Sequence, residues 1–208
     1  MMKVGIINYG LGNISAFKFA FKKLNCEVII AEKPNDIHNC SHLILPGVGS
    51  FDYAISLIKK SKLLNALTED VFINKKPIMG ICVGMQILFD SSEEGELKGL
   101  GWIKGKVKKF DINTFKKINL PHMGWNNIDE NKLNNKLCFN LNNEEFYFLH
   151  SYHCVPEDKD IIVSTTEYGQ KFCSAINSKN IFGCQFHPEK SHDSGLKIFS
   201  NFLKISQC

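Results

Sequence analysis

The chain has 208 residues, a formal net charge of +4 and a hydrophobic content of 44%, which suits one globular domain spanning residues 1–208. Its apolar runs are much shorter than the ~20 residues of a membrane-spanning helix, and its amino terminus lacks the apolar core of a signal peptide. We therefore expect a cytoplasmic protein with no membrane association.

Strands and helices are predicted to alternate in the first half of the chain. Continuous apolar runs predict strands at residues 3–8, 27–31, 41–47 and 77–81. Apolar residues at helical spacing predict a helix at 14–24 with Asn13 as its N-cap, a helical stretch from about 52 to 74 that breaks near Ser61, and a helix that begins after Cys82. Apolar strands that alternate with amphipathic helices indicate a parallel sheet covered on both faces.

The second half consists mainly of short predicted strands joined by polar turns. We expect strands at residues 101–110, 146–154, 161–168, 171–178 and 181–188, surface turns across the asparagine-rich residues 129–145, and a final helix at 193–205. The predicted fold class is α/β, with a mostly parallel central sheet flanked by helices and an additional antiparallel region in the second half.

The cysteines and lysines indicate neither a metal nor a nucleic acid. Eight cysteines are spread along the chain without CxxC spacing, so we expect reduced thiols and no zinc site. The densest basic run places Lys104, Lys106 and Lys108 on one face of a predicted strand. A nucleic-acid patch is one interpretation, and a solvated strand face is the simpler one. We expect no metal and no cofactor.

A glycine-bearing loop follows the first predicted strand. Gly10 and Gly12 precede a helix, and Glu32 lies about 20 residues further on, as in a dinucleotide-binding fingerprint. The third fingerprint position is Ser15, however, where a small glycine or alanine is expected. Dinucleotide binding by residues 10–15 remains an alternative, because a lone GxG is also common in tight turns.

A pentapeptide at residues 80–84, Gly-Ile-Cys-Val-Gly, lies where an apolar strand gives way to a helix. It matches the pattern that holds a nucleophile at a sharp strand-to-helix turn, with small residues on both sides because the chain approaches itself closely. The helix amino terminus stabilises a thiolate at Cys82, and the backbone N–H of Val83 points towards an oxyanion formed beside the sulfur. The alternative is a structural cysteine buried in the core.

A nucleophilic cysteine needs a base, and residues 187–189 offer one. His187 and Glu189 flank Pro188, so in an extended segment their side chains share one side. A carboxylate beside an imidazole holds its tautomer and stabilises the imidazolium, as in a catalytic triad. The alternative is a loop histidine near a solvated acid.

A third loop, Pro46–Asp52, follows its own predicted strand. If the strands are parallel, this loop lies at the same sheet edge as Cys82. The glycines on either side of Val48 allow the backbone to approach a ligand and turn an N–H towards it. A plain turn is the alternative.

Taken together, these segments resemble the class I (triad) glutamine amidotransferases, and within them the glutaminase subunits of imidazole glycerol phosphate synthase. The likeness extends over nearly the whole chain, in the stretches NYGLGN, PGVGSF, GICVGMQILF, LPHMGWN, FYFLHSY and QFHPEKS. The PHMGWN and YGLGN stretches distinguish this subfamily from other triad glutaminases.

The resemblance implies a catalytic role for three residues. Cys82 is the nucleophile, His187 the general base and then acid, and Glu189 the carboxylate that orients the histidine. The family's oxyanion hole corresponds to the backbone of Val83 and, after a rearrangement of its loop, of Val48. L-glutamine, the substrate, is bound in the family by positions that correspond to Gly49, Gln86, Glu94, Ser151 and Tyr152.

The resemblance also implies a partner. Asn13, Trp125 and Lys190 match family positions at the interface with a (β/α)8-barrel cyclase subunit, which receives the ammonia and makes imidazole glycerol phosphate in histidine biosynthesis. Some relatives serve surface-sugar pathways instead and pass ammonia to a homologous barrel. The triad is the same in both, so the sequence leaves the acceptor open.

Overall fold

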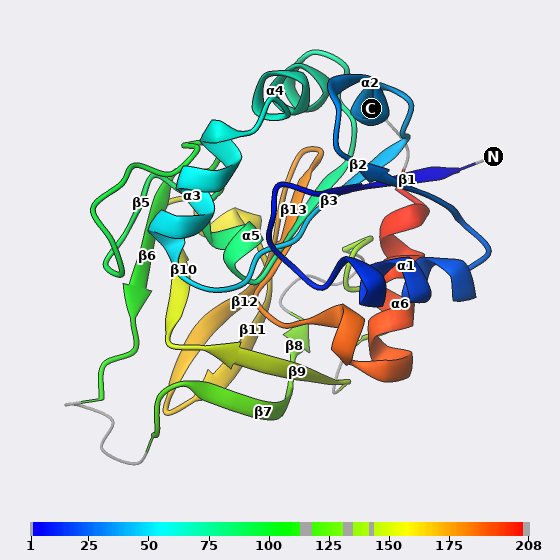
Figure 1. The fold of residues 1–208 in the computed structure, drawn as a ribbon. Coiled ribbons are helices and arrows are strands. Elements are labelled where there is room, and N and C mark those ends of the chain that lie inside the picture. The colour runs from blue at the N-terminus through cyan, green and yellow to red at the C-terminus, as the bar shows by residue number, and fades with distance from the viewer. Residues whose placement is uncertain (1, 113–117, 131–134, 142–143, 206–208) are drawn as a thin grey trace.

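An eight-stranded sheet forms the centre of the protein. The computed structural model describes residues 2–112, 118–130, 135–141 and 144–205. In spatial order (Figure 1) the strands are β2 (Glu27–Ala31), β1 (Lys3–Ile7), β3 (His42–Leu45), β4 (Ile78–Ile81), β13 (Ile181–Cys184), β12 (Gln170–Ser178), β11 (Ile162–Tyr168) and β8 (Asp129–Glu130). Neighbours are parallel from β2 to β13 and antiparallel from β13 to β8. The predicted α/β fold class, with its antiparallel region in the second half, is confirmed.

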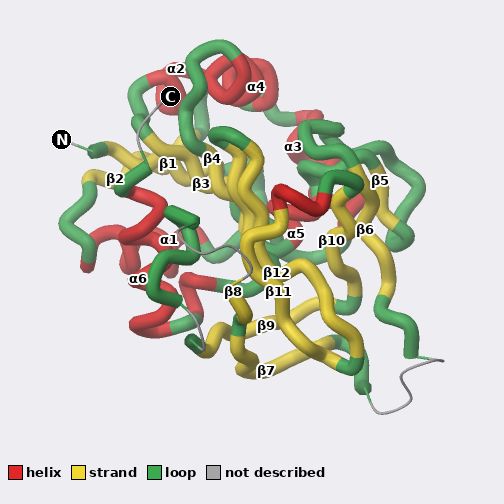
Figure 2. Tube along the Cα trace, turned by 180° about the vertical axis from the view of Figure 1, so that it is seen from behind, coloured by secondary structure: helices red, strands yellow, loops and turns green. Residues whose placement is uncertain are grey.

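Helices cover both faces of this sheet. They are α1 (Ile14–Lys23), α2 (Pro34–His38), α3 (Phe51–Lys60), α4 (Leu64–Phe72), α5 (Val83–Gln86) and α6 (His192–Leu203). Phe21 of α1 packs on Phe199 of α6, with ring centroids 4.6 Å apart. Phe182 of β13 contacts α6, whereas the next residue, Gly183, faces Met85 of α5. Because successive strand residues point to opposite faces, α6 and α5 lie on opposite sides of the sheet, as Figure 2 shows.

Two small sheets extend the second half of the chain. One contains β5 (Ser91–Ser92), β6 (Gly105–Lys109) and β10 (Tyr152–Pro156), and the other pairs β7 (His122–Asn127) with β9 (Glu145–His150). The strand predicted at 146–154 is therefore two strands in different sheets. The chain bends at Ser151, where the His150 Nδ1 lies 2.8 Å from the carbonyl oxygen of Tyr152. This bend brings Ser151 and Tyr152 to the edge of the central sheet.

Most predicted elements agree with the structure, with some shifts at their ends. The helical stretch from 52 to 74 divides into α3 and α4 around Ser61, as predicted. The strand predicted from residue 101 begins only at Gly105, because Gly101 has a positive φ of 67°. Turns occupy residues 136–140, while residues 131–134 and 142–143 lie outside the described residues. Helix α2 and strands β5, β7 and β8 were not predicted, and β8 lies where turns were expected. The strand predicted at 181–188 ends at Cys184, and Pro188–Lys190 form a 3-10 turn.

The glycine loop after β1 has a structural explanation. Gly12 has a φ of +97° and lies so close to Pro46 that a Cβ atom there would be 2.6 Å from the proline Cβ. Asn13 caps α1, as predicted, by accepting a hydrogen bond from the N–H of Ala16. Glu32, the expected ribose ligand of the dinucleotide alternative, accepts a hydrogen bond from Asn8 at 2.8 Å. Close packing against Pro46 thus explains Gly12, and helix capping explains Asn13.

The lysine-rich strand β6 and the described cysteines show how the surface and the thiols are arranged. Lys104, Lys106 and Lys108 are exposed. The described cysteines all carry free thiols. In the part of the chain that the structure describes, no helix is both long enough and apolar enough to cross a membrane.

Candidate active site

Cys82 sits at a strained turn between β4 and α5. Its φ of 54° and ψ of −115° are unfavourable for a residue with a side chain. A Cβ atom at Gly80 would lie 2.6 Å from the carbonyl oxygen of Gly84, so the turn requires glycine there. The close self-approach predicted from the pentapeptide is therefore present. The turn aims the sulfur at the carboxyl edge of the sheet, where ligands of open α/β sheets bind.

His187 and Glu189 lie in the segment that leaves the same sheet edge after β13. The His187 N–H donates to the carbonyl oxygen of Tyr147 at 2.8 Å, and its carbonyl oxygen accepts from the Ser191 hydroxyl at 2.7 Å. Its Nδ1 is 2.8 Å from Oε1 of Glu189, and both side chains are almost fully buried. The backbone is therefore fixed on both sides, and the imidazole is held by a carboxylate.

The charge and hydrogen bonding around His187 favour its protonated imidazolium form. Burial by itself lowers the pKa of His187, but the charge and hydrogen bonding of Cys82 and Glu189 outweigh it and raise that pKa to about 10. The histidine is thus protonated near neutral pH and faces the sulfur. Such a pair supplies a nucleophile and a proton donor in one pocket.

The triad opens into a pocket of about 250 Å³. Cys82 and His187 line it, and Glu189 supports the histidine from behind. The pocket brings together most of the residues that the sequence singled out, namely Val48, Gly49, Val83, Glu94, Ser151, Tyr152 and Lys190. Pro121, Leu149 and His150 complete its wall. This volume suits a small polar metabolite rather than a macromolecule.

The loop that carries Val48 is packed against the start of α5. A Cβ atom at Gly47 would lie 2.0 Å from the backbone nitrogen of Gly84, and the hydroxyl of Tyr9 donates to the carbonyl oxygen of Pro46 at 2.7 Å. Val83 is the first residue of α5, a position whose N–H has no partner inside the helix. The backbone of Val83 therefore lies beside the nucleophile, next to the loop of Val48 and Gly49.

Two other residues implied by the family likeness have structural contacts of their own. Glu94 lines the pocket, and its Oε2 accepts from the N–H of Phe51 at 2.8 Å, which caps α3. Gln86 is buried, is absent from the pocket wall, and donates to the carbonyl oxygen of Tyr152 at 3.0 Å. Glu94 thus holds α3 as well as facing the pocket, and Gln86 holds the Tyr152 segment.

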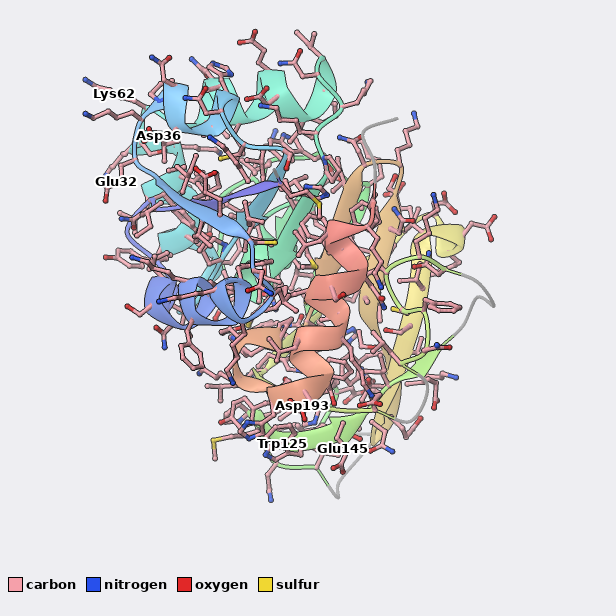
Figure 3. The ribbon with its side chains drawn as sticks, turned by 90° about the vertical axis from the view of Figure 1, so that its right-hand side faces the viewer. Glu32, Asp36, Lys62, Trp125, Glu145 and Asp193 are labelled. Atoms are coloured by element: carbon pink, nitrogen blue, oxygen red, sulfur yellow. The ribbon has the colours of Figure 1, made fainter. Side chains whose placement is uncertain are left out.

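Two of the three residues expected at a partner interface lie next to the triad, and the third lies at the start of α6. Asn13 and Lys190 line a second cavity, of about 190 Å³, which also borders His187 and Glu189. Trp125 is 47% exposed and stacks on His192, with centroids 5.3 Å apart. Figure 3 shows Trp125 at the start of α6, near Asp193. Asn13 and Lys190 therefore adjoin the triad, and Trp125 lies at the start of α6.

The sequence analysis did not single out two buried residues next to the triad. Gln185 donates from Nε2 to the sulfur of Cys82 at 3.7 Å. His150 lines the pocket, and its Nε2 lies 3.1 Å from Nδ1 of His122. Gln185 stands two positions before His187 in the quoted QFHPEKS stretch, so the signal was present. Its contact with Cys82, which lies 103 residues away in the chain, could not be inferred from the sequence.

Comparison with known proteins identifies the class of protein. The family model described as glutamine amidotransferase class-I matches residues 5–205. The chain therefore belongs to the class-I glutamine amidotransferase family, as the sequence resemblance predicted.

Its relatives among curated proteins carry a more particular name. A protein of Methanococcus maripaludis named imidazole glycerol phosphate synthase subunit HisH 2 is 46% identical, over 97% of this chain and 98% of the relative. The subunit HisH of Leptospira interrogans is 43% identical, over 97% of this chain and 100% of the relative.

Solved structures of the same fold are more distant in sequence. A crystal structure described as a glutamine amidotransferase has a TM-score of 0.75 at 16% identity, covering 97% of this chain and 99% of the other. The crystal structure of a glutamine amidotransferase from Thermotoga maritima has a TM-score of 0.65 at 17% identity, covering 98% of this chain and 84% of the other. These similarities establish the fold.

Proposed function

We propose that this protein is the glutaminase subunit of an imidazole glycerol phosphate synthase, with residues 1–208 as one glutaminase domain acting in the cytoplasm. It hydrolyses L-glutamine to glutamate and ammonia through Cys82, His187 and Glu189. The observation that carries the proposal is a small pocket lined by Cys82 and His187, with Glu189 held against the histidine, in a chain of the glutamine amidotransferase family.

The thiolate of Cys82 attacks the carboxamide carbon of glutamine. A C–S bond forms and the carbonyl π electrons move to oxygen, giving a tetrahedral oxyanion beside the N–H groups of Val83 and, after its loop rearranges, Val48. The imidazolium of His187 gives its proton to the amide nitrogen, the C–N bond breaks, and ammonia leaves. Neutral His187 then takes a proton from water as the water attacks the thioester, and glutamate and the thiolate are released.

The pocket also supplies groups that distinguish glutamine from other amides. In this proposal the carboxylate of Glu94 faces the α-ammonium group, while Gly49, Ser151 and Tyr152 bind the rest of the amino acid. Gln86 contributes by holding the Tyr152 carbonyl. Opposite charges attract strongly when they meet in a site shielded from water, so glutamine is favoured over amides that lack the α-amino group.

Ammonia released into bulk water at neutral pH becomes ammonium and is no longer a nucleophile. We therefore infer that a partner covers the pocket and receives the ammonia. Asn13 and Lys190 line the cavity next to the triad, and the exposed Trp125 stacks on His192 at the start of α6, which suits such a partner. The partner proposed is a (β/α)8-barrel cyclase that uses ammonia to form imidazole glycerol phosphate and an aminoimidazole carboxamide ribotide.

Glutamate formation with and without the histidine-pathway cyclase, supplied together with its nucleotide substrate, tests this proposal. We expect the complete mixture to raise the rate at least roughly tenfold, because binding across the pocket orders the catalytic groups. Replacing Trp125 with alanine is expected to weaken association about 10- to 100-fold, as for buried aromatic anchors of interfaces.

Phe139→Ala is the matched control for Trp125. Phe139 is similarly exposed, at 52%, but lines a different cavity against α6, so its removal should leave association unchanged. If the cyclase gives no stimulation while a homologous surface-sugar synthase does, the acceptor in this proposal is wrong. If neither partner nor free enzyme yields glutamate, the glutaminase function itself is wrong.

Glu189→Gln is expected to move the alkaline limit of activity to lower pH. Glu189 is one of the groups that raise the pKa of His187 to about 10, so without its charge the imidazolium loses its proton at lower pH. Because the imidazolium protonates the leaving ammonia, kcat/KM should begin to fall about one pH unit or more earlier. The measurement is kcat/KM for glutamine between pH 6 and 10.5.

The control for this profile is Glu144→Gln. Glu144 bonds to Ser194 and Lys197 at the surface, and the Lys197 and Ser194 hydrogen bonds lower its pKa. Its replacement should leave the alkaline limit where it is. An unchanged limit in Glu189→Gln would mean that the carboxylate does not control the protonation of His187.

A further inference from the structure

Gln185 is a polar side chain placed in the core directly beneath the triad. It follows the last residue of β13 and precedes His187 by two positions, and it is completely buried. Its backbone N–H donates to the carbonyl oxygen of Ser174 at 2.9 Å, which ties it to β12. A buried amide is unfavourable unless its donors and acceptor are satisfied, so its partners indicate why it is there.

The orientation of the Gln185 amide follows from a chain of hydrogen bonds. The carbonyl oxygen of Tyr152 can only accept, so Gln86, 3.0 Å away, must present its NH₂ group to it. The same Nε2 of Gln86 lies 3.0 Å from Oε1 of Gln185, which must therefore accept. The NH₂ group of Gln185 is thus left to face the sulfur of Cys82, at 3.7 Å. One backbone carbonyl fixes both side-chain amides.

Two groups contact the Cys82 sulfur with opposite preferences. The carbonyl oxygen of Leu149, at 3.8 Å, can only accept and so favours the protonated thiol. The NH₂ group of Gln185 can only donate, which favours the thiolate. Because Gln86 prevents the Gln185 amide from turning over, the donor cannot be exchanged for an acceptor.

The other titratable groups around the sulfur do not replace Gln185 and His187 in stabilising the Cys82 thiolate. Burial raises the pKa of Tyr9, Cys154 and Cys184, the charge of Cys82 adding to it, so they are neutral near pH 7. Burial, against the hydrogen bond to the Tyr152 carbonyl, lowers the pKa of His150, which is neutral as well. Glu94 and Lys190, which carry side chains of opposite charge type, line the same pocket as Cys82.

We propose that Gln185 is a further catalytic residue, which donates a hydrogen bond to the Cys82 thiolate, and that Gln86 is the positioning residue that fixes its orientation. This inference rests on the proposed function, in which Cys82 is the nucleophile. The Gln185 amide stabilises the negative charge on sulfur before the attack on glutamine. The backbone N–H of Val83 stabilises the negative charge on oxygen after that attack.

The test is the pH dependence of alkylation of Cys82 by iodoacetamide, followed by mass spectrometry of the peptide that contains it. Gln185→Met keeps the length and volume of the side chain but removes the donor. We expect the midpoint of the alkylation curve to rise by roughly one pH unit. Gln185→Glu, which places a carboxylate at the sulfur, should raise it further. The acid limit of kcat/KM for glutamine should move with it.

Gln170→Met is the matched control, since Gln170 also offers its amide to a side chain, with Nε2 2.9 Å from Nε2 of His153. Its midpoint should equal that of the unmodified protein. If Gln185→Met melts at a lower temperature yet keeps the same midpoint, Gln185 is structural and the inference is overturned. If Cys82→Ser remains fully active, the proposed function fails instead, so the two failures are distinguishable.

Discussion

Cys82→Ala is expected to abolish glutamate formation, lowering kcat by at least about a thousandfold. In the proposed mechanism the substitution removes the atom that forms the thioester, and the groups that remain can only bind glutamine and polarise its amide. In hydrolases with a catalytic triad, loss of the nucleophile costs as much as loss of the whole triad. The assay is glutamate release in the presence of the cyclase partner, so that activation by the partner is not limiting.

Substitutions of Cys82 are also expected to change the melting temperature in an unusual order. Cys82 has a φ of 54°, which glycine adopts without strain and alanine does not. Cys82→Gly should therefore be inactive but melt about 2–4 °C above Cys82→Ala, the shift expected for about 1 kcal/mol in a chain of this size. A folded, inactive glycine variant separates loss of chemistry from loss of structure.

Cys26→Ala is the control for both measurements. Cys26 is a partly exposed free thiol between α1 and β2, remote from the pocket. It should retain full activity and near-normal stability. Retention of activity by Cys82→Ala would remove this residue from the mechanism and leave the strained turn without a catalytic explanation.

The parts of the site predicted from sequence are those that depend on local chain geometry. The pentapeptide around Cys82 encodes a turn in which positions 80 and 84 meet, and the structure has that contact. His187 and Glu189 are likewise close enough in sequence to make the predicted contact between imidazole and carboxylate, although Pro188–Lys190 form a 3-10 turn rather than the expected extended segment. In both cases residues a few positions apart determine the geometry, so the pattern alone is informative.

The parts that sequence reasoning missed depend on contacts between distant residues. Gln185 meets Gln86 across 99 positions, and Glu94 caps a helix start 43 positions away. No periodicity records such pairs. The bend at Ser151 is also invisible to strand propensity, because its flanking residues suit one long strand. Helix α2 is different, since Pro34 at its start and Asp36, which accepts from the N–H of Lys33, were available signals.

Gly84→Ala is expected to be both strongly destabilising and nearly inactive. Gly84 lies within α5, where alanine is normally preferred, but a Cβ atom there would lie 2.0 Å from the carbonyl oxygen of Leu45. Because the obstruction is backbone of the central sheet, the helix must move away from β3. We expect a loss of about 3 kcal/mol, the upper part of the usual overpacking range, which lowers the melting temperature by roughly 6–12 °C.

The displacement should also disrupt catalysis in the molecules that remain folded. The start of α5 carries the Val83 N–H and contacts the loop of Val48 through Gly47, so a shift of about 1 Å misplaces both proposed oxyanion donors and can reduce kcat about a hundredfold. Gly101→Ala is the control, with a φ of +67° and its nearest neighbour, the Asp90 carboxylate, 3.4 Å away. It should lose only about 1–2 kcal/mol, the cost of the left-handed backbone, and keep its kcat. If Gly84→Ala behaves like Gly101→Ala, the close packing of β3 against α5 does not position the catalytic turn.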